Sequence, residues 1–342
     1  MRQRRCGRGC ANIEVKTEVA PTGTPNERAQ AVARAVALLR AGEIVALPTE
    51  TVYGLAADAL SAAALVKIFE TKERPRFNPL IVHLPELNWL EKVAVIKDDA
   101  RALTEKLIAA FWPGPLTIVL PRTDLVPPIV TAGLATIAIR MSAHPLFSEV
   151  VCTLGRPLAA PSANRFGRIS PTAAAHVAEE LSGRIPLIVD GGATEHGIES
   201  TVIAVRDGGI MMLRAGPISR EELAKLGEVR RRESKRLDAP GQLPAHYRPQ
   251  TPLVIASELS EIPVPEGKRY GALLWSSAPL SETFAESRRL STSGDLREAA
   301  ANLFRQLREL DHAGLDYIVA EAVPEEGLGV AIMDRLRRAA HS

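Results

Sequence analysis

The chain has 342 residues, a formal net charge of +2 and three cysteines. This length fits two domains of about 100–200 residues each, and the near-neutral charge excludes a protein that coats nucleic acid by charge alone. Cys6, Cys10 and Cys152 are too few and too scattered for a disulfide framework, and they fit a reducing, cytoplasmic location. No apolar run approaches the roughly 20 residues of a spanning helix, so no membrane association is expected.

Residues 1–25 form an expected loose basic arm, whose arginines could contact RNA or simply be solvated. After it, helical and strand patterns interleave. The predicted helices cover residues 27–42, 61–72, 98–111, 171–183 and 219–227. The predicted strands cover residues 43–48, 79–84, 116–121, 136–140, 157–161, 187–192, 200–205 and 210–216.

Capping residues support four of these helices. Asn26, Ser61, Ser170 and Ser219 each precede a helical pattern, and Ser, Thr, Asn and Asp are the side chains that cap helix N-termini. Pro171 fits the first turn of its helix. The last two strands read as a hairpin, so residues 26–226 are expected to fold around a mixed, open α/β sheet.

The stretch 227–251 is polar, charged and rich in proline, and it is predicted to link two domains. Strands follow at 253–257, 269–275 and 316–323, with helices at 295–314 and 327–340. This order predicts a smaller Rossmann-like α/β domain with a parallel sheet over residues 252–342.

The familiar nucleotide-binding and catalytic motifs are missing. There is no P-loop, no dinucleotide fingerprint, no nucleophile elbow and no clustered Cys/His metal set. Any phosphate group would therefore have to be bound by a different kind of loop. Lys72 and Arg74, in the loop KERPRFNP, can form a two-cation clamp for a polyphosphate, although a solvated charged loop explains the same residues.

Three further loops carry hydroxyl groups next to strand ends. Residues 160–172 join a strand to a helix, where Ser170 either caps the helix or helps to hold an anion. Ser200 and Arg214 lie at the ends of neighbouring strands, where α/β sheets place ligands. Residues 49–54 could hold a small polar substrate or simply form a turn with satisfied side chains.

These loops match a known family when they are taken together. The segments PTETVYGL, KERPRFNPLIVHL, FWPGPLTIVL, IAIR, APSANRFGRISPT, IESTV and LRAG resemble the YrdC family in order and spacing. With PGQLPAHYRP and GLGVAIMDRLRRAA, the chain resembles the long two-domain form, the threonylcarbamoyl-AMP synthases, from about Asn26 to its end.

The resemblance implies a twisted sheet with a large, positively charged cleft, and a nucleotidyltransferase reaction. Threonine, bicarbonate and ATP with Mg²⁺ would give threonylcarbamoyl-AMP and pyrophosphate. The adenylate would pass to a tRNA-modifying threonylcarbamoyl transferase complex, which modifies the adenosine beside the anticodon. Direct contact with tRNA and the identity of the partner stay open.

The resemblance also implies roles for individual side chains. Lys72 and Arg74 would be the catalytic cations, and His83, in a strand, has a satisfied core histidine as its alternative reading. Threonine would be held by Thr51, His83, Arg140 and Ser200. ATP would be held by Lys72, Arg74, Asn78, Thr136, Ser162, Asn164, Ser170, Arg214, His246 and Tyr247. The last two belong to the linker, which would fold over the cleft as a lid.

Two other functions compete with this one. An RNA-binding module would use the same basic cleft without turning over ATP, and its binding would depend steeply on salt. A carbamoyl-adenylate enzyme of hydrogenase maturation would carry an acylphosphatase-like part and zinc-finger cysteines, which this sequence lacks. A purely structural role needs neither the cation clamp nor the linker motif.

Overall fold

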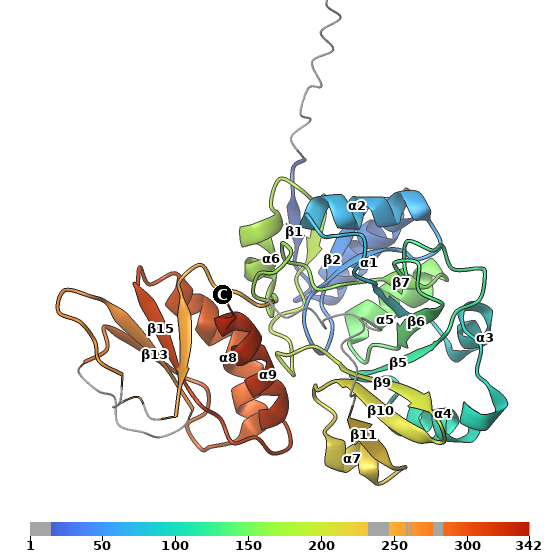
Figure 1. Ribbon diagram of the computed structural model, residues 1–342. Coiled ribbons are helices and arrows are strands. Elements are labelled where there is room, and N and C mark those ends of the chain that lie inside the picture. The colour runs from blue at the N-terminus through green and yellow to red at the C-terminus, as the bar shows by residue number, and fades with distance from the viewer. Residues whose placement is uncertain (1–14, 232–245, 258, 260–261, 276–282, 342) are drawn as a thin grey trace, which may run out of the picture.

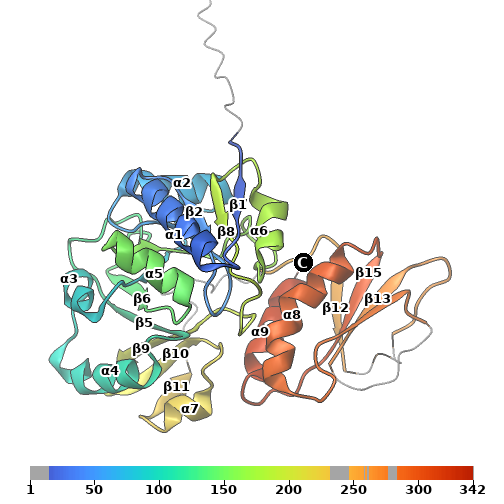
Figure 2. The same ribbon diagram turned by 180° about the vertical axis from the view of Figure 1, so that it is seen from behind.

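The computed structural model describes residues 15–231, 246–257, 259, 262–275 and 283–341. They fold into two domains, each with its own sheet (Figures 1 and 2). The predicted loose arm lies outside the described residues up to residue 14, and the linker does so over residues 232–245. Within the described part, no helix is long and apolar enough to cross a membrane.

The large domain is built on an eleven-stranded mixed sheet in the order β1-β8-β2-β3-β7-β4-β6-β5-β9-β10-β11. Its strands are β1 (Glu18–Ala20), β2 (Val45–Leu47), β3 (Gly54–Asp58), β4 (Ile81–His83), β5 (Leu116–Pro121), β6 (Thr136–Arg140), β7 (Leu158–Ala159), β8 (Leu187–Val189), β9 (Thr201–Arg206), β10 (Gly209–Arg214) and β11 (Val229–Arg231). The predicted mixed sheet is confirmed, as is the antiparallel hairpin of β9 and β10.

The helices are α1 (Pro25–Arg40), α2 (Ala62–Lys72), α3 (Leu90–Val93), α4 (Asp98–Phe111), α5 (Pro145–Leu154), α6 (Ala174–Leu181) and α7 (Arg220–Ala224), with a 3₁₀ turn at Leu87–Trp89. Val45 and Leu47 of β2 pack with α1 and α5, whereas Ala46 points to the core shared by α2, α4 and α6. This alternation is the period of two that a strand imposes on its side chains. Helices therefore cover both faces of the sheet around β2.

Two structured segments replace what was predicted as arm and linker. Residues 18–20 form β1, which pairs in parallel with β8 at the edge of the sheet. Residues 229–231 form β11, which pairs in parallel with β10. Both predictions were wrong there, because three-residue strands carry too little pattern to be recognised and are held by pairing with distant residues.

Two predicted caps were also wrong. Helix α1 begins one residue before Asn26, with Thr24 as its N-cap, Pro25 in the first turn and Glu27 completing a capping box. Helix α6 begins at Ala174, not Pro171, and Ser170 does not cap it. The predicted caps at Ser61 and Ser219 are confirmed.

The small domain has a four-stranded sheet in the order β12-β15-β13-β14, and all of its pairs are parallel. Its elements are β12 (Leu253–Ala256), β13 (Tyr270–Leu274), β14 (Glu286–Arg289), α8 (Leu296–Asp311), β15 (Tyr317–Glu321) and α9 (Gly329–Ala340). The predicted parallel α/β domain is confirmed, although β14 carries no apolar pattern and was not predicted.

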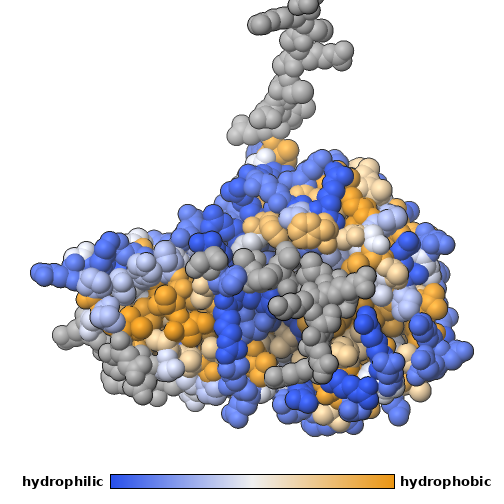
Figure 3. All heavy atoms as spheres, viewed as in Figure 1, coloured by the Kyte–Doolittle hydropathy of each residue, from blue (hydrophilic) through white to orange (hydrophobic). Residues whose placement is uncertain are grey.

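Helices α8 and α9 lie on the side of the small sheet that faces the large domain (Figures 1 and 2). Contact is close: a side chain at Gly197 would meet the backbone of Ala300 and Ala301 at 2.5 Å. On the face in Figure 3, hydrophilic side chains gather along the junction of the domains. The two domains are thus docked through the helices of the smaller one.

Candidate active site

One cavity of the large domain collects most of the predicted site side chains. It is open to solvent, with about 580 Å³ of empty space when the open part is included, and it lies beside β4, β6 and the loops that precede β3 and β9. Among the residues predicted from sequence, its lining contains Thr51, Arg74, His83, Arg140, Ser162, Ser200, Arg214, His246 and Tyr247. Segments more than 190 residues apart in sequence therefore meet here, as the prediction required.

The sheet itself sets up this meeting. Strands β4 and β6 are parallel and in register, so that His83 lies opposite Arg140. Ile81, Ala138 and Val202 form a small apolar cluster in which every described member belongs to a strand. Because side chains two residues apart share a face, His83 and Arg140 project on the same side as this cluster. The strand ends thus present two polar side chains on the face of the sheet that carries this strand cluster.

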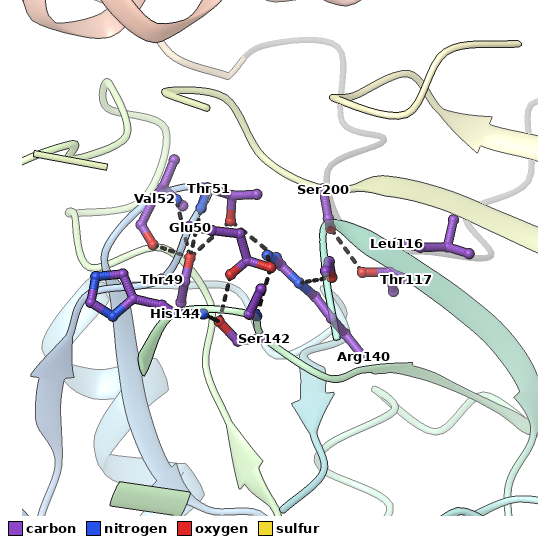
Figure 4. Close-up of polar contacts among 12 residues, drawn as sticks. Thr49, Glu50, Thr51, Val52, Leu116, Thr117, Arg140, Ser142, His144 and Ser200 are labelled. Carbon is purple, nitrogen blue, oxygen red and sulfur yellow. Dashed lines mark hydrogen bonds and ion pairs between the residues drawn. The ribbon is translucent and has the colours of Figure 1, made fainter. Parts of the chain in front are cut away.

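Arg140 is held from three sides (Figure 4). Its Nε donates to the carbonyl of Gly114 at 3.1 Å, and its Nη1 donates to Thr51 Oγ1 at 3.0 Å. Its Nη2 lies 2.8 Å from Glu50 Oε1. A guanidinium carries five N–H donors, so the fixed group keeps donors for a ligand. A planar, oriented guanidinium is suited to binding a carboxylate through two bonds.

Glu50 anchors this arrangement, although it was not among the predicted residues. Its carboxylate accepts bonds from the Ser142 hydroxyl and the Ala143 backbone N–H, in addition to Arg140. Burial would raise the pKa of Glu50, but the charge of Arg140 and these hydrogen bonds lower it to about 2. The carboxylate is therefore ionised at neutral pH and fixes Arg140.

The loop before β3 combines both interpretations offered for it. Thr49 forms a turn, since its hydroxyl donates to the Val52 carbonyl at 2.6 Å and accepts from backbone N–H groups. Thr51, two residues on, turns its hydroxyl toward Arg140. The His83 ring packs against the Phe147 ring at a tilt of 46°, with ring centroids 4.6 Å apart, and burial lowers the pKa of His83 to about 3. The imidazole is thus neutral at physiological pH.

A second group of contacts forms around Ser200. Arg214, at the end of β10, donates to the Ser200 carbonyl at 2.9 and 3.1 Å and to its hydroxyl at 3.0 Å. The same hydroxyl lies 2.8 Å from Thr117 Oγ1 (Figure 4). These contacts fix a second guanidinium in the cavity wall.

Glu199, next to Ser200, lines the same wall. Its carboxylate accepts a hydrogen bond from Ser170 at 2.6 Å and lies 3.2 Å from Nε of Arg335, which belongs to α9 of the small domain. Burial would raise the pKa of Glu199, but Arg335, Arg214 and the Ser170 hydroxyl lower it to about 2. Ser170 is thus engaged by Glu199 and does not cap α6.

Lys72 and Asn164 lie behind the cavity wall. The Lys72 ammonium donates to the backbone carbonyls of Ser162 and Asn164, and burial together with nearby Arg74 holds its pKa well below the usual value. The Asn164 amide donates to the carbonyls of Arg165 and Arg168. Both side chains shape the loop that presents Ser162, and their direct contact with ATP stays a prediction.

Arg74 enters the cavity from the loop after α2. Its guanidinium donates to the carbonyls of Asn78 and Pro79, and burial lowers its pKa to about 9. Asn78 is buried and supports Arg74 through its backbone. His246 and Tyr247 pack against each other at 4.1 Å between ring centres. Lys72 is the last residue of α2, so it does not lie with Arg74 in the loop that was predicted to carry both cations.

Thr136 is not brought to this cavity. It begins β6, whereas Arg140 ends the strand, and four residues of strand span about 13 Å. Thr136 instead lines a separate cavity beside Pro121 and Gly208. The geometry therefore gives no support to its predicted role in binding ATP.

The sequence interpretation missed the two acidic residues of the site, Glu50 and Glu199, and the arginine Arg335. Each lies inside a motif already singled out: PTETVYGL, IESTV and GLGVAIMDRLRRAA. A charged residue amid apolar and hydroxyl-bearing neighbours was the available signal, since charges are buried only when they are paired. Among the described residues, no group of three or more His, Cys, Asp and Glu side chains could hold a metal ion.

The fold and this cavity define a class of protein, and comparisons with known proteins agree. Residues 37–216 match the Sua5/YciO/YrdC family model, described as "Telomere recombination". Residues 218–341 match the model described as "Threonylcarbamoyl-AMP synthase, C-terminal domain". The chain belongs to the Sua5/YciO/YrdC family, in its long two-domain form.

Individual relatives are similar over nearly the whole chain. The threonylcarbamoyl-AMP synthases of Pyrococcus abyssi and Bacillus subtilis (strain 168) are each 42% identical over 325 residues, which cover 89% and 90% of this chain and 92% of each relative. The crystal structure of P. abyssi Sua5 complexed with L-threonine has a TM-score of 0.84 at 38% identity, with 95% of this chain and 97% of that chain covered.

Proposed function

We propose that the chain is a threonylcarbamoyl-AMP synthase, which forms threonylcarbamoyl-AMP and pyrophosphate from L-threonine, bicarbonate and ATP. The observation that carries this function is one cavity lined by three arginines, Arg74, Arg140 and Arg214, and by the hydroxyls of Thr51, Ser162 and Ser200. Such a cavity suits one carboxylate and one polyphosphate side by side. The P. abyssi relative binds L-threonine, and its sequence and fold are shared over almost the whole chain.

Arg140 is the residue we assign to the threonine carboxylate. Its guanidinium is fixed by Glu50 and by Gly114, while Thr51 and His83 flank it in the cavity lining. His83 is neutral because burial lowers its pKa, so it can contact the amine or hydroxyl of threonine without adding charge. Ser200 lies at the junction with the nucleotide end, because its hydroxyl also contacts Arg214.

The phosphates of ATP are assigned to Arg74, Arg214 and the loop of Ser162. The threonine amine condenses with bicarbonate to give a carbamate and water. A carbamate oxygen then bonds to the α-phosphorus, the bond from that phosphorus to the bridging oxygen breaks, and pyrophosphate leaves. Orientation in the cavity can contribute about 7–11 kcal/mol, and arginines can stabilise the charge that develops on the phosphates.

Mg²⁺ is expected to enter with ATP, and this too is a proposal. Magnesium often keeps waters and phosphate oxygens as its main ligands and takes one or two carboxylates from the protein. Glu50 and Glu199 are already engaged by arginines, which fits a metal carried by the phosphates. Its chemistry would be to neutralise charge on the leaving pyrophosphate.

The product suits a tRNA-modifying threonylcarbamoyl transferase complex, which would take up the mixed anhydride. Direct contact with tRNA and a cytoplasmic location belong to the same proposal, since ATP and tRNA are both available there.

Pyrophosphate release tests this function. The full chain is incubated with Mg²⁺, ATP and bicarbonate, together with threonine, serine, valine or no amino acid. Release that requires both threonine and bicarbonate is expected. Absence of release with every amino acid, combined with RNA binding that weakens steeply with salt, would instead favour an RNA-binding module.

A further inference from the structure

An arginine of the small domain is buried behind the wall of the large-domain cavity. Arg335, on α9, is 1% exposed. Its Nε lies 3.2 Å from Glu199 Oε2, and its Nη1 donates to the Ala215 carbonyl at 2.8 Å. On its other side it lies over the Tyr247 ring at 5.6 Å. The side chain thus joins three groups that belong to or adjoin the cavity.

The contact matters because Glu199 places a negative charge in the cavity lining. The carboxylate lines the cavity at the end that carries Ser200 and Arg214, and it also holds the Ser170 hydroxyl. A buried negative charge there repels a polyphosphate, because Coulomb interactions are strong where water is excluded. The positive charge of Arg335 offsets that repulsion, and its hydrogen bond orients the carboxylate toward Ser170.

Further contacts between the two domains hold Arg335 next to Glu199. Arg308 of α8 donates to the Ile169 carbonyl and forms an ion pair with Glu180. Phe304 of the same helix stacks on Tyr247 with ring centres 5.3 Å apart. These contacts fix α8 and α9 against the segment that contains Ser170. Arg335 itself is not part of the cavity lining and acts through its neighbours.

We propose that Arg335 is a positioning residue for the nucleotide: by pairing with Glu199 it lets that wall accept a polyphosphate, so the ATP site is complete only when the small domain is docked. This inference rests on the proposed function, since it presumes that ATP binds beside Ser170 and Arg214. It assigns the small domain a direct part in nucleotide affinity, and none in threonine affinity, because Arg140 is held entirely by the large domain.

The test compares four forms of the full chain by steady-state pyrophosphate release and by direct titration with Mg²⁺-ATP. Arg335→Met is expected to raise both the KM and the dissociation constant for ATP by roughly tenfold or more, as when one partner of a buried charge pair is removed. The KM for threonine should stay within about twofold. Arg335→Lys keeps the charge and should retain most of the ATP affinity. Arg337 lies on the same helix as Arg335 and forms an exposed ion pair with Glu325, which precedes the helix, so Arg337→Ala is the matched control.

A double variant separates this role from a merely structural one. In Arg335→Met/Glu199→Gln neither charge remains, so ATP should bind more tightly than in Arg335→Met alone. A structural role predicts the opposite order, with two defects worse than one. Thermal unfolding followed by circular dichroism checks that each form is folded at the assay temperature. If Arg335→Met is not, Arg335→Gln replaces it with the same expected order.

Three results would overturn the inference: unchanged ATP affinity in Arg335→Met, equal increases in both KM values, or a double variant weaker than the single one. Failure of the proposed function looks different. In that case the unsubstituted chain would release no pyrophosphate with any amino acid, whatever residue stands at position 335.

Discussion

Each end of the cavity contains a buried glutamate paired with an arginine, but the two arginines come from different domains. Glu50 and Glu199 are both buried, ionised carboxylates, and each accepts bonds from an arginine and a serine hydroxyl. At the end proposed for threonine the arginine, Arg140, comes from the same sheet. At the end proposed for the nucleotide the arginine, Arg335, comes from the other domain.

This difference indicates which domains fix the side chains at each end of the cavity. The Glu50–Arg140 pair forms as soon as the large domain folds, because both residues lie in its sheet and loops. The Glu199–Arg335 pair spans 136 positions and needs a second folded domain in contact. Threonine binding is therefore expected to depend on one domain and nucleotide binding on two.

The largest effect is expected from Arg140→Ala. Removing one partner of a buried pair leaves Glu50 uncompensated, which costs about 3–5 kcal/mol of stability. Loss of the group assigned to the threonine carboxylate should also lower kcat/KM for threonine by roughly 100-fold or more. Thermal unfolding and pyrophosphate release measure the two effects. Arg101→Ala, which breaks an exposed pair with Glu91, should leave both unchanged.

The second largest effect is expected from Lys72→Met. The buried ammonium supports the carbonyls of Ser162 and Asn164, and leaving such groups unsatisfied costs about 1–3 kcal/mol. Adenylate formation is expected to be abolished, while the rest of the fold persists. Hydrogen exchange should increase in residues 162–168 more than elsewhere. Normal pyrophosphate release by the folded variant would contradict the role given to Lys72.

Gly197→Ala tests whether ATP affinity depends on domain docking, with a substitution outside the cavity lining. The added methyl group would meet the backbone of Ala300 and Ala301 at 2.5 Å, so α8 must move away from the large domain. ATP affinity should fall roughly tenfold, as for loss of the Arg335 contact, and threonine affinity should not. Gly192→Ala is the control. Gly192 also has a positive φ, 79° against 66° for Gly197, but nothing lies within 4 Å of its new methyl group. Equal effects of the two substitutions would show that strain, and not domain docking, is responsible.

The smallest effect concerns pH. His83 has a pKa near 3 in the folded chain and an ordinary value of 6.5 when it is exposed. Between these values the unfolded chain binds more protons, so stability is present above pH 6.5 and is lost as pH falls toward 3. His83→Asn should make the slope of stability with pH shallower by up to about 1.4 kcal/mol per pH unit in this window. Urea unfolding at pH 4, 5, 6 and 7 measures it. An unchanged slope would mean that His83 is not buried in neutral form.

Much of the fold could be predicted from local signals. Helices with a capping side chain and a periodic apolar face, such as α2 with Ser61 and α8 with Asp295, were found at nearly their observed bounds. Elements that lack such signals were missed. Strand β14 reads Glu-Ser-Arg-Arg, β3 begins with glycine, and α5 is an apolar stretch rich in β-branched residues. These segments owe their structure to neighbours in space.

The candidate site divides in the same way. Residues within family-like motifs, among them Thr51, Arg74 and Arg214, could be assigned to one cavity, and the structure brings them together. Their mutual contacts could not be predicted, because Glu199 meets Arg335 only after two domains dock. The cap predicted at Ser170 failed because of contacts within the large domain: its hydroxyl is used by Glu199, 29 positions away, while the N–H of Thr172 is bonded to His176 of α6.

The two outer strands of the large sheet have a consequence for the protein at high concentration. Strands β1 and β11 each have three residues and lie at opposite ends of the strand order. Short outer strands expose few backbone groups to which a neighbouring molecule could add a strand, and a charged residue such as Glu18 on β1 discourages stacking further. A wide sheet of this kind would otherwise be a template for aggregation. Such short outer strands are expected to limit edge-to-edge association between molecules, even though the sheet has eleven strands.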